Sequence, residues 1–95
     1  MCSFSFQLKE HSEYTVEESG IYLIAIVHSG VISQNLLSAI SLGSNHDSEN
    51  KWYPCRFIIS DFVDPYVKIE YNSYLKKIRN ITDYKRKITL IKIAN

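Results

Sequence analysis

The first residues of the chain alternate between apolar and polar side chains. Phe4, Phe6 and Leu8 are separated by serine and glutamine side chains. Because successive side chains of a β-strand point to opposite faces, this pattern predicts a strand with one buried face and one wet face. Residues 9–20 are mostly polar and end in Ser19-Gly20, which predicts a connection that closes in a turn.

Residues 21–27 read Ile-Tyr-Leu-Ile-Ala-Ile-Val and have no polar side of their own. Their β-branched content and the flanking Gly20 and Gly30 favour a strand over a buried helix. A strand that is apolar on both faces needs protein against each of them. We therefore expect one face to pack inside the domain and the other to meet a further layer or a neighbouring subunit.

The middle of the chain is less regular. Residues 31–43 fit a strand or a short helix capped by Gly43, and we favour the strand. Residues 43–51 are the most polar stretch and predict an exposed loop. Residues 51–62 (KWYPCRFIISDF) predict another strand, with Pro54 at a sheet edge or a bulge because it lacks an N–H. A turn is expected at Asp64-Pro65.

The last third continues the alternation. Residues 67–71 read as a strand, Asn72-Ser73 as a turn, and residues 74–81 as a bulged strand or one helical turn. Residues 86–93 alternate and then change phase between Leu90 and Ile91, which a β-bulge or a strand covered on both faces would require. The chain is therefore expected to be all-β, an antiparallel sandwich or barrel of about seven or eight short strands.

The composition supports one folded domain spanning residues 1–95. The hydrophobic fraction is 45% and the aromatic fraction 13%, which is enough to build a core. No apolar stretch approaches the length of a membrane span, and no secretion signal is visible. Cys2 and Cys55 are expected to be free thiols. The histidines stand alone without metal-ligand spacing, so we predict no metal and no cofactor.

The net charge of +1 hides a division between two parts of the chain. Residues 1–65 hold three basic residues against eight acidic ones, a balance of −5, and residues 66–95 hold eight against two, a balance of +6. Either the basic third has an acidic partner, or strands from the two parts lie side by side and neutralise each other. We favour the second explanation because it needs no ligand.

Catalytic motifs are weak in this sequence. Asp61 and Asp64, or the adjacent Glu17 and Glu18, could supply the two carboxylates of a glycosidase, but eight carboxylates in 65 residues produce such pairs by chance. No serine lies in a nucleophile-elbow context, and no glycine-rich phosphate loop occurs. We predict that the protein is not an enzyme and has no catalytic residues.

Binding chemistry is better represented. Aromatic rings offer flat apolar faces, and in Tyr and Trp a polar handle, so they suit sugars and protein interfaces. Lys85-Arg86-Lys87 beside Tyr84 could contact an acidic group or could be a wet turn. Asn80-Ile81-Thr82 is formally a glycosylation sequon. The candidate ligand-binding residues border the polar loop or the expected strand ends: His46, Asp47, Trp52, Tyr53, Tyr66 and Tyr74.

The segments SGIYLIAIV, VKIEY and RKITLIKI resemble those of the small β-sandwich head domains at the distal ends of bacteriophage tail fibres and tailspikes. The Gly-Ile-Tyr strand entry is also similar to that of trimeric jelly-roll heads of the complement and tumour necrosis factor type. The chain is shorter than the usual complement-type head and lacks its aromatic-rich closing motif.

The resemblance implies a jelly-roll-like β-sandwich that forms a homotrimer at a fibre tip in the virion. It implies a receptor-binding or trimerisation role toward a cell-surface polysaccharide or protein. From the charge and the length of the apolar runs we expect no nucleic-acid partner and no membrane insertion. On this view the second face of residues 21–27, made by Ile21, Leu23, Ala25 and Val27, is the subunit interface.

A different class of function is also open. The protein could be a small cytoplasmic inhibitor or regulatory protein that binds a partner through its basic C-terminal third. It would then be a monomer or dimer whose partner binding weakens steeply as salt rises. The oligomeric state distinguishes the two hypotheses.

Overall fold

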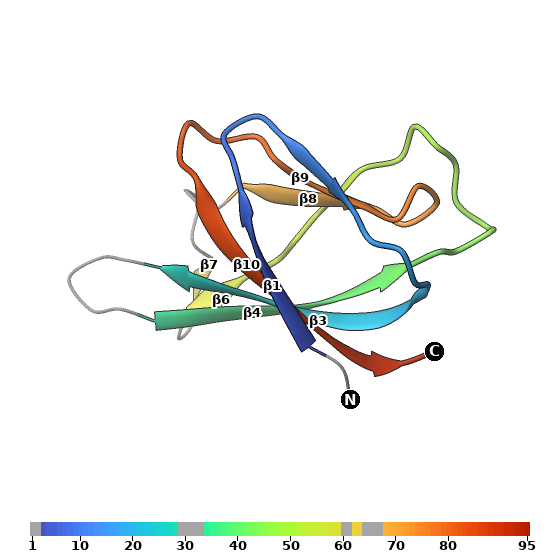
Figure 1. Ribbon diagram of the computed structural model, residues 1–95, viewed down its shortest axis with the longest axis horizontal. Helices are drawn as coiled ribbons and strands as arrows, with labels where there is room; N and C mark the ends of the chain where they lie inside the picture. Colours follow the sequence, from blue (N-terminus) through green and yellow to red (C-terminus); the bar gives the residue numbers. More distant parts are fainter. Residues whose placement is uncertain (1–2, 29–33, 60–61, 64–67) are drawn as a thin grey trace.

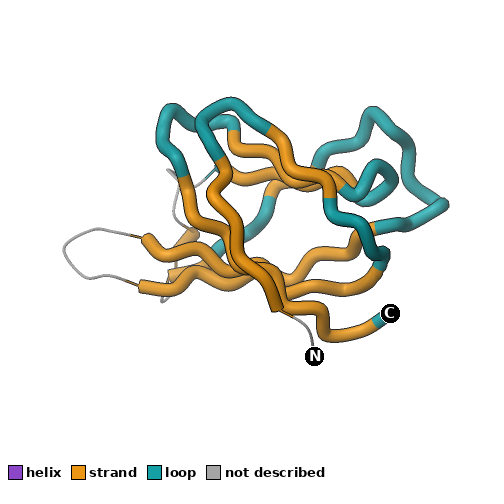
Figure 2. The backbone as a smooth tube through the Cα atoms, viewed as in Figure 1, coloured by secondary structure: helices purple, strands orange, loops and turns teal. Residues whose placement is uncertain are grey.

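Antiparallel β-strands make up the framework of the protein. The structure is a computed structural model that describes residues 3–28, 34–59, 62–63 and 68–95. Over those residues it contains strands and loops but no helix, as Figure 2 shows, and so it holds no helix long and apolar enough to cross a membrane. The prediction of an all-β, antiparallel fold is confirmed.

The first sheet contains the three longest strands. Its order is β1-β10-β3-β4, and its strands are β1 (Ser3–Leu8), β10 (Arg86–Ala94), β3 (Gly20–His28) and β4 (Gln34–Leu42). Each neighbouring pair is antiparallel. Because β1 and β10 are paired, the two ends of the chain lie close together (Figure 1).

The second sheet has shorter strands in the order β2-β9-β8-β5. They are β2 (Glu13–Thr15), β9 (Lys77–Asn80), β8 (Ile69–Asn72) and β5 (Tyr53–Pro54). Pro54 lies on the edge strand β5, as expected of a residue that cannot donate to a ladder. A separate pair is formed by β6 (Ile58–Ile59) and β7 (Phe62–Val63).

The strand pairing is partly nested. β1 pairs with the last strand, β10, and β2 pairs with β9, which is the nesting of a jelly roll. The next pairs, β3–β4 and β8–β9, are instead hairpins between consecutive strands. Short connections favour such pairing of sequence neighbours. Two four-stranded antiparallel sheets linked in this way have the layout of a small β-sandwich.

Several local expectations can be compared with the strands. Residues 34–42 form a strand, so the helical alternative there is wrong. The single strand expected over residues 51–62 is also wrong, because the ladder of β5 stops at Pro54 and resumes separately in β6 and β7. The turn expected at Asp64-Pro65 lies outside the described residues. The short strand β2 was not expected, because it lies within a polar stretch with one aromatic residue, Tyr14.

The alternation of β10 continues past the position where a phase change was expected. Ile88 and Leu90 are fully buried, whereas the flanking Thr89 and Ile91 are half-buried. The irregularity lies further on, where the pairing with β3 slips between Lys92 and Ala94. A bulge is therefore present, but it is placed at the end of the strand.

Both sheets contribute side chains to one hydrophobic core. The first sheet supplies every second residue of its strands, including the fully buried Ile24 and Leu90, and the second sheet supplies Ile69 and Ile78. Val16, Cys55 and Phe57, which lie outside the strands, also belong to the cluster. The side chains on the opposite side of each sheet point away from this core, so the molecule has two distinct outer faces.

Candidate functional site

The outer face of the first sheet is almost free of charge. Strand register and alternation place the odd-numbered residues of its strands on this side. Among the described side chains of this face, Lys87 at one end carries a charge. Gln7, opposite Lys87, is polar but uncharged. The remaining members are apolar or small: Ser3, Ser5, Ile21, Leu23, Ala25, Leu37, Ala39, Ser41, Thr89 and Ile91. We call these residues, without Lys87, the uncharged face.

The uncharged face contains the interface residues expected from the sequence. Ile21, Leu23 and Ala25 lie on it, while the alternate residues of β3 point into the core. Val27 lies in the same strand, but its side chain is outside the described part of the structure. Leu37, opposite Ala25, is 51% exposed and Ile21 is 40% exposed. In a single chain these large aliphatic groups are left in contact with water.

The outer face of the second sheet is charged. Lys77 Nζ lies 3.2 Å from Glu13 Oε2 across the β2–β9 pair. The guanidinium of Arg79 donates to Glu70 Oε1 from Nε at 2.7 Å and from its terminal nitrogen at 2.6 Å. The same guanidinium lies 4.0 Å from the centre of the Trp52 ring. This row of paired charges, Glu13, Lys77, Arg79 and Glu70, is referred to below as the charged face.

Ion pairs join the acidic and basic parts of the chain. Glu13 with Lys77 is one example, and Glu18 with Lys92, at 3.1 Å, is another. Both link the acidic N-terminal part to the basic last third, as the neutralisation hypothesis expects.

The predicted recognition loop is only partly available to a ligand. The hydroxyl of Tyr53 donates to Asp47 Oδ1 at 2.8 Å, and this bond, followed by burial, raises the pKa of Tyr53. Trp52 is half-buried under Arg79, whereas His46 is exposed. Tyr74, 48% exposed, lies apart in the turn between β8 and β9. Tyr66 lies outside the described residues. Tyr53 and Trp52 are therefore already engaged by other side chains of the protein, which leaves less of the loop available to a ligand.

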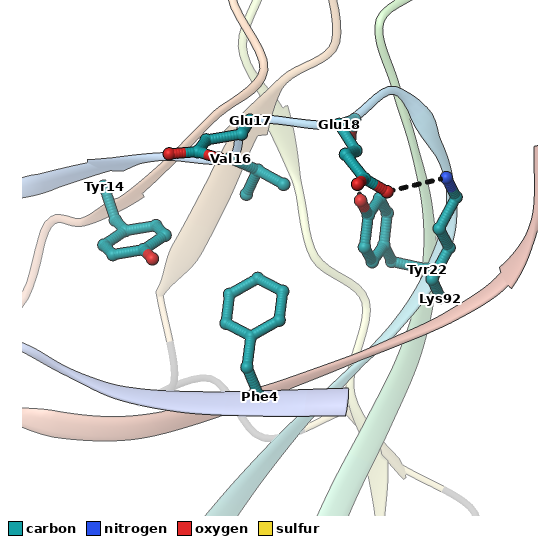
Figure 3. Close-up of a pocket in the computed structure, with 7 residues that line it drawn as sticks. All are labelled: Phe4, Tyr14, Val16, Glu17, Glu18, Tyr22 and Lys92. Carbon is teal, nitrogen blue, oxygen red and sulfur yellow. Dashed lines mark hydrogen bonds and ion pairs between the residues drawn. The ribbon is translucent and has the colours of Figure 1, made fainter. Parts of the chain in front are cut away.

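A cleft opens where the edge strands β1 and β2 separate. It has a volume of about 350 Å³ and is lined by Phe4, Tyr14, Val16, Glu17, Glu18, Tyr22 and Lys92. Further along the same two strands, the rings of Phe6 and Tyr14 are stacked with their centres 3.8 Å apart and close the gap between the sheets. Phe4 points from β1 into the open part, between Tyr14 and Tyr22, as Figure 3 shows. Its ring is 38% exposed.

Hydrogen bonds to backbone carbonyls hold Glu17 and Glu18, the acidic rim of this cleft, in place. The Val16 N–H donates to the carbonyl of Lys76 at 2.8 Å, and Lys76 Nζ donates to the carbonyl of Glu17 at 2.8 Å. The hydroxyl of Tyr22 donates to the carbonyl of Glu18 at 2.7 Å. The rim is therefore fixed to the turn before β9 on one side and to β3 on the other.

Gly20 lets the chain enter β3 directly below this rim. A Cβ at this position would lie 2.7 Å from the backbone oxygen of Ala94, closer than real Cβ contacts come. The backbone φ of Gly20 is +157°, which side chains also disfavour. A glycine is thus required where β3 begins beside the bulged end of β10.

Two other features noted in the sequence are buried. Asn80, in the Asn-Ile-Thr sequon, is 0% exposed, and its amide donates to the carbonyls of Leu8 and Tyr84. That amide cannot accept a glycan in the folded protein. Cys55 is a free, buried thiol, and burial raises its pKa to about 12. Cys2 lies outside the described residues.

Comparisons with models of protein families, with curated proteins and with solved structures find no match to this chain. Its function is therefore to be inferred from its two outer faces and its cleft.

Sequence reasoning missed the cleft. Glu17 and Glu18 were considered only as a chance pair of glycosidase carboxylates, and Phe4 and Lys92 only as strand residues. Phe4 and Lys92 are 88 positions apart in the 95-residue chain, and they meet because β1 pairs with β10. Only the strand order, which one sequence does not supply, could have brought them together.

Proposed function

We propose that this protein is a non-enzymatic trimerisation and receptor-binding domain that acts at the tip of a phage tail fibre or tailspike. The fibre-tip setting follows from the sequence resemblance. The observation that supports self-association is the uncharged face, which carries exposed Leu37 and Ile21 on a sheet whose inner side is already filled. Exposed apolar patches of this kind are typical of protein interfaces.

A second copy of the same chain is the occupant that the charge pattern favours. Copies around a threefold axis make head-to-tail contacts, but side chains that point at the axis itself meet their own counterparts, so a charge there would face like charges. The aliphatic and small side chains of the uncharged face avoid that repulsion. Burial of Leu37, Ile21 and Leu23 between copies would then supply the stabilising free energy.

The edges of the two sheets agree with this proposal. β2 and β5, at the edges of the second sheet, are three and two residues long and contain Glu13 and Pro54. β1 and β4, at the edges of the first sheet, are six and nine residues long and contain neither charge nor proline. Short, charged or proline-bearing edges resist pairing with other chains, and long uncharged edges do not. The first sheet is thus the side suited to assembly.

The test is the mass of the protein in solution, measured by light scattering. We expect about three times the 11.0 kDa of one chain. A monomer at all accessible concentrations would contradict the proposal. A monomer that also bound an acidic partner, with affinity falling steeply as salt rises, would instead favour a regulatory protein acting through its basic C-terminal third.

A further inference from the structure

We infer that the cleft between β1 and β2 binds one neutral sugar unit, stacked on Phe4 and hydrogen-bonded by the rim of Glu17, Glu18 and Lys92. This inference deepens the receptor-binding part of the proposed function and is independent of self-association. It also moves the expected ligand site away from the loop around Trp52.

The shape and lining of the cleft suit a sugar ring. Its volume of about 350 Å³ falls within the range of small-molecule sites. Phe4 and Tyr14 offer aromatic surface to the apolar C–H side of a sugar, with their ring centres 6.4 Å apart. The Phe4 ring also contacts Phe6, with centres 6.0 Å apart, but it stays 38% exposed, so part of its surface is available for a ligand.

The polar groups lie on the rim, where sugar hydroxyls would be. Glu18 Oε2 already accepts from Lys92 Nζ at 3.1 Å, which holds both side chains at the cleft. Within the described residues, the carboxylate of Glu17 has no hydrogen bond or ion pair. Carboxylates accept from hydroxyls, and charge-assisted bonds of this type are strong. An ammonium beside them can donate to a ring or hydroxyl oxygen.

The charges favour a neutral ligand over an acidic one. The lining holds two carboxylates and one ammonium, and the ammonium is paired with Glu18. Lys76 donates a hydrogen bond to the carbonyl of Glu17 and partly offsets the negative charge of the rim, but it does not line the cleft. A sialic or uronic acid would bring its carboxylate toward the unpaired Glu17. A quaternary ammonium would be opposed by Lys92.

The experiment is an NMR titration of the whole protein with four probes. They are a glucose trisaccharide, an N-acetylglucosamine trisaccharide, sialyllactose and choline. We expect a neutral trisaccharide to shift the amide signals of residues 14–18 and of Phe4. Phe4→Ala should weaken this binding at least tenfold, and Glu17→Gln severalfold. Tyr84→Ala, which removes a more exposed ring elsewhere, is the matched control and should leave the affinity unchanged.

Each other result would overturn the inference. No shift with either neutral sugar, shifts around Trp52 instead, or binding of sialyllactose or choline alone would each do so. If Phe4→Ala does not fold, Glu17→Gln decides, and unchanged affinity in that variant contradicts the inference. Light scattering on the same samples separates the two ideas, since a trimer without sugar binding leaves the proposed assembly intact. A monomer that binds a neutral sugar supports the cleft alone.

Discussion

The two sheets of this protein have similar inner sides and very different outer sides. Their inner sides share aliphatic residues such as Ile24 and Ile78 in one core. On the second sheet, the outer side carries the paired charges of Glu13, Lys77, Arg79 and Glu70. On the first sheet, the corresponding positions carry aliphatic and small side chains such as Leu37 and Ala25. The outer side of the second sheet is thus suited to contact with water, and the outer side of the first sheet is suited to contact with another protein surface.

The difference separates the apolar run after Gly20 into two sets of side chains. Tyr22, Ile24 and Ile26 are buried and serve the fold of a single chain. Ile21, Leu23 and Ala25 lie outside that core on the other side of the strand. The proposed association gives the second set its purpose.

The largest expected effect compares an inward residue with an outward one. Ile24→Ala removes buried methylene groups from the core and should lower the free energy of unfolding by about 3 kcal/mol. Leu37→Ala, at a position half in water, should cost about 0.5 kcal/mol in a dilute, dissociated sample. Urea denaturation measures both. Equal losses of unfolding free energy in the two variants would contradict the assignment of Ile24 to the core and of Leu37 to the outer face.

The second prediction concerns the buried thiol of Cys55 on the inner side of the second sheet. Cys55 follows β5, and its N–H donates to the carbonyl of Ile69 at 2.8 Å. Burial raises the pKa of this thiol to about 12 in the folded protein, whereas the pKa of a cysteine in an unfolded chain is about 8.5. Above that pH the unfolded state loses the proton and the folded state keeps it, so stability falls as pH rises.

The expected size of this effect is about 2 kcal/mol between pH 8 and pH 10. It is measured as the difference between the native protein and Cys55→Ala, which lacks the thiol, so that other titrating groups cancel. The folded thiol should also resist iodoacetamide at pH 8. Parallel pH profiles, or rapid modification of Cys55 without unfolding, would contradict a buried position.

The smallest expected effect lies on the charged face. Trp52 and Arg79 are in cation–π contact at 4.0 Å, and a double-mutant cycle with Trp52→Leu and Arg79→Met should give a coupling of about 0.5–1 kcal/mol. The Glu13–Lys77 pair is partly exposed and should contribute less, because solvent screens it. A coupling near zero between Trp52 and Arg79 would mean that the ring does not rest on the guanidinium in solution.

The alternation of side chains predicted much of the fold. Phe4, Phe6 and Leu8 predicted β1 correctly, and the β-branched residues after Gly20 predicted β3. β2 escaped prediction because a strand of three residues offers only Tyr14 as an inward position. The interruption after Pro54 could be expected as an edge or bulge, but not as a division into separate strands.

The candidate site was less accessible to sequence reasoning. Tyr53 and Trp52 could be recognised as aromatic, but not that Asp47 and Arg79 already engage them. The cleft combines Phe4, Glu17, Glu18 and Lys92, which come from strands and turns that meet only in the folded chain. The pairing of β1 with β10 decides that meeting, and long-range pairing leaves no mark in local periodicity.

The most direct test of the account places one new charge on each outer face. Leu37→Lys adds a cation to the uncharged face at a half-exposed position, and Thr15→Lys adds one to an exposed position on the outer side of the second sheet. By light scattering, we predict that Leu37→Lys is a folded monomer while Thr15→Lys keeps the mass of a trimer. Equal masses for the two variants would contradict the claim that the first sheet is the surface through which copies associate.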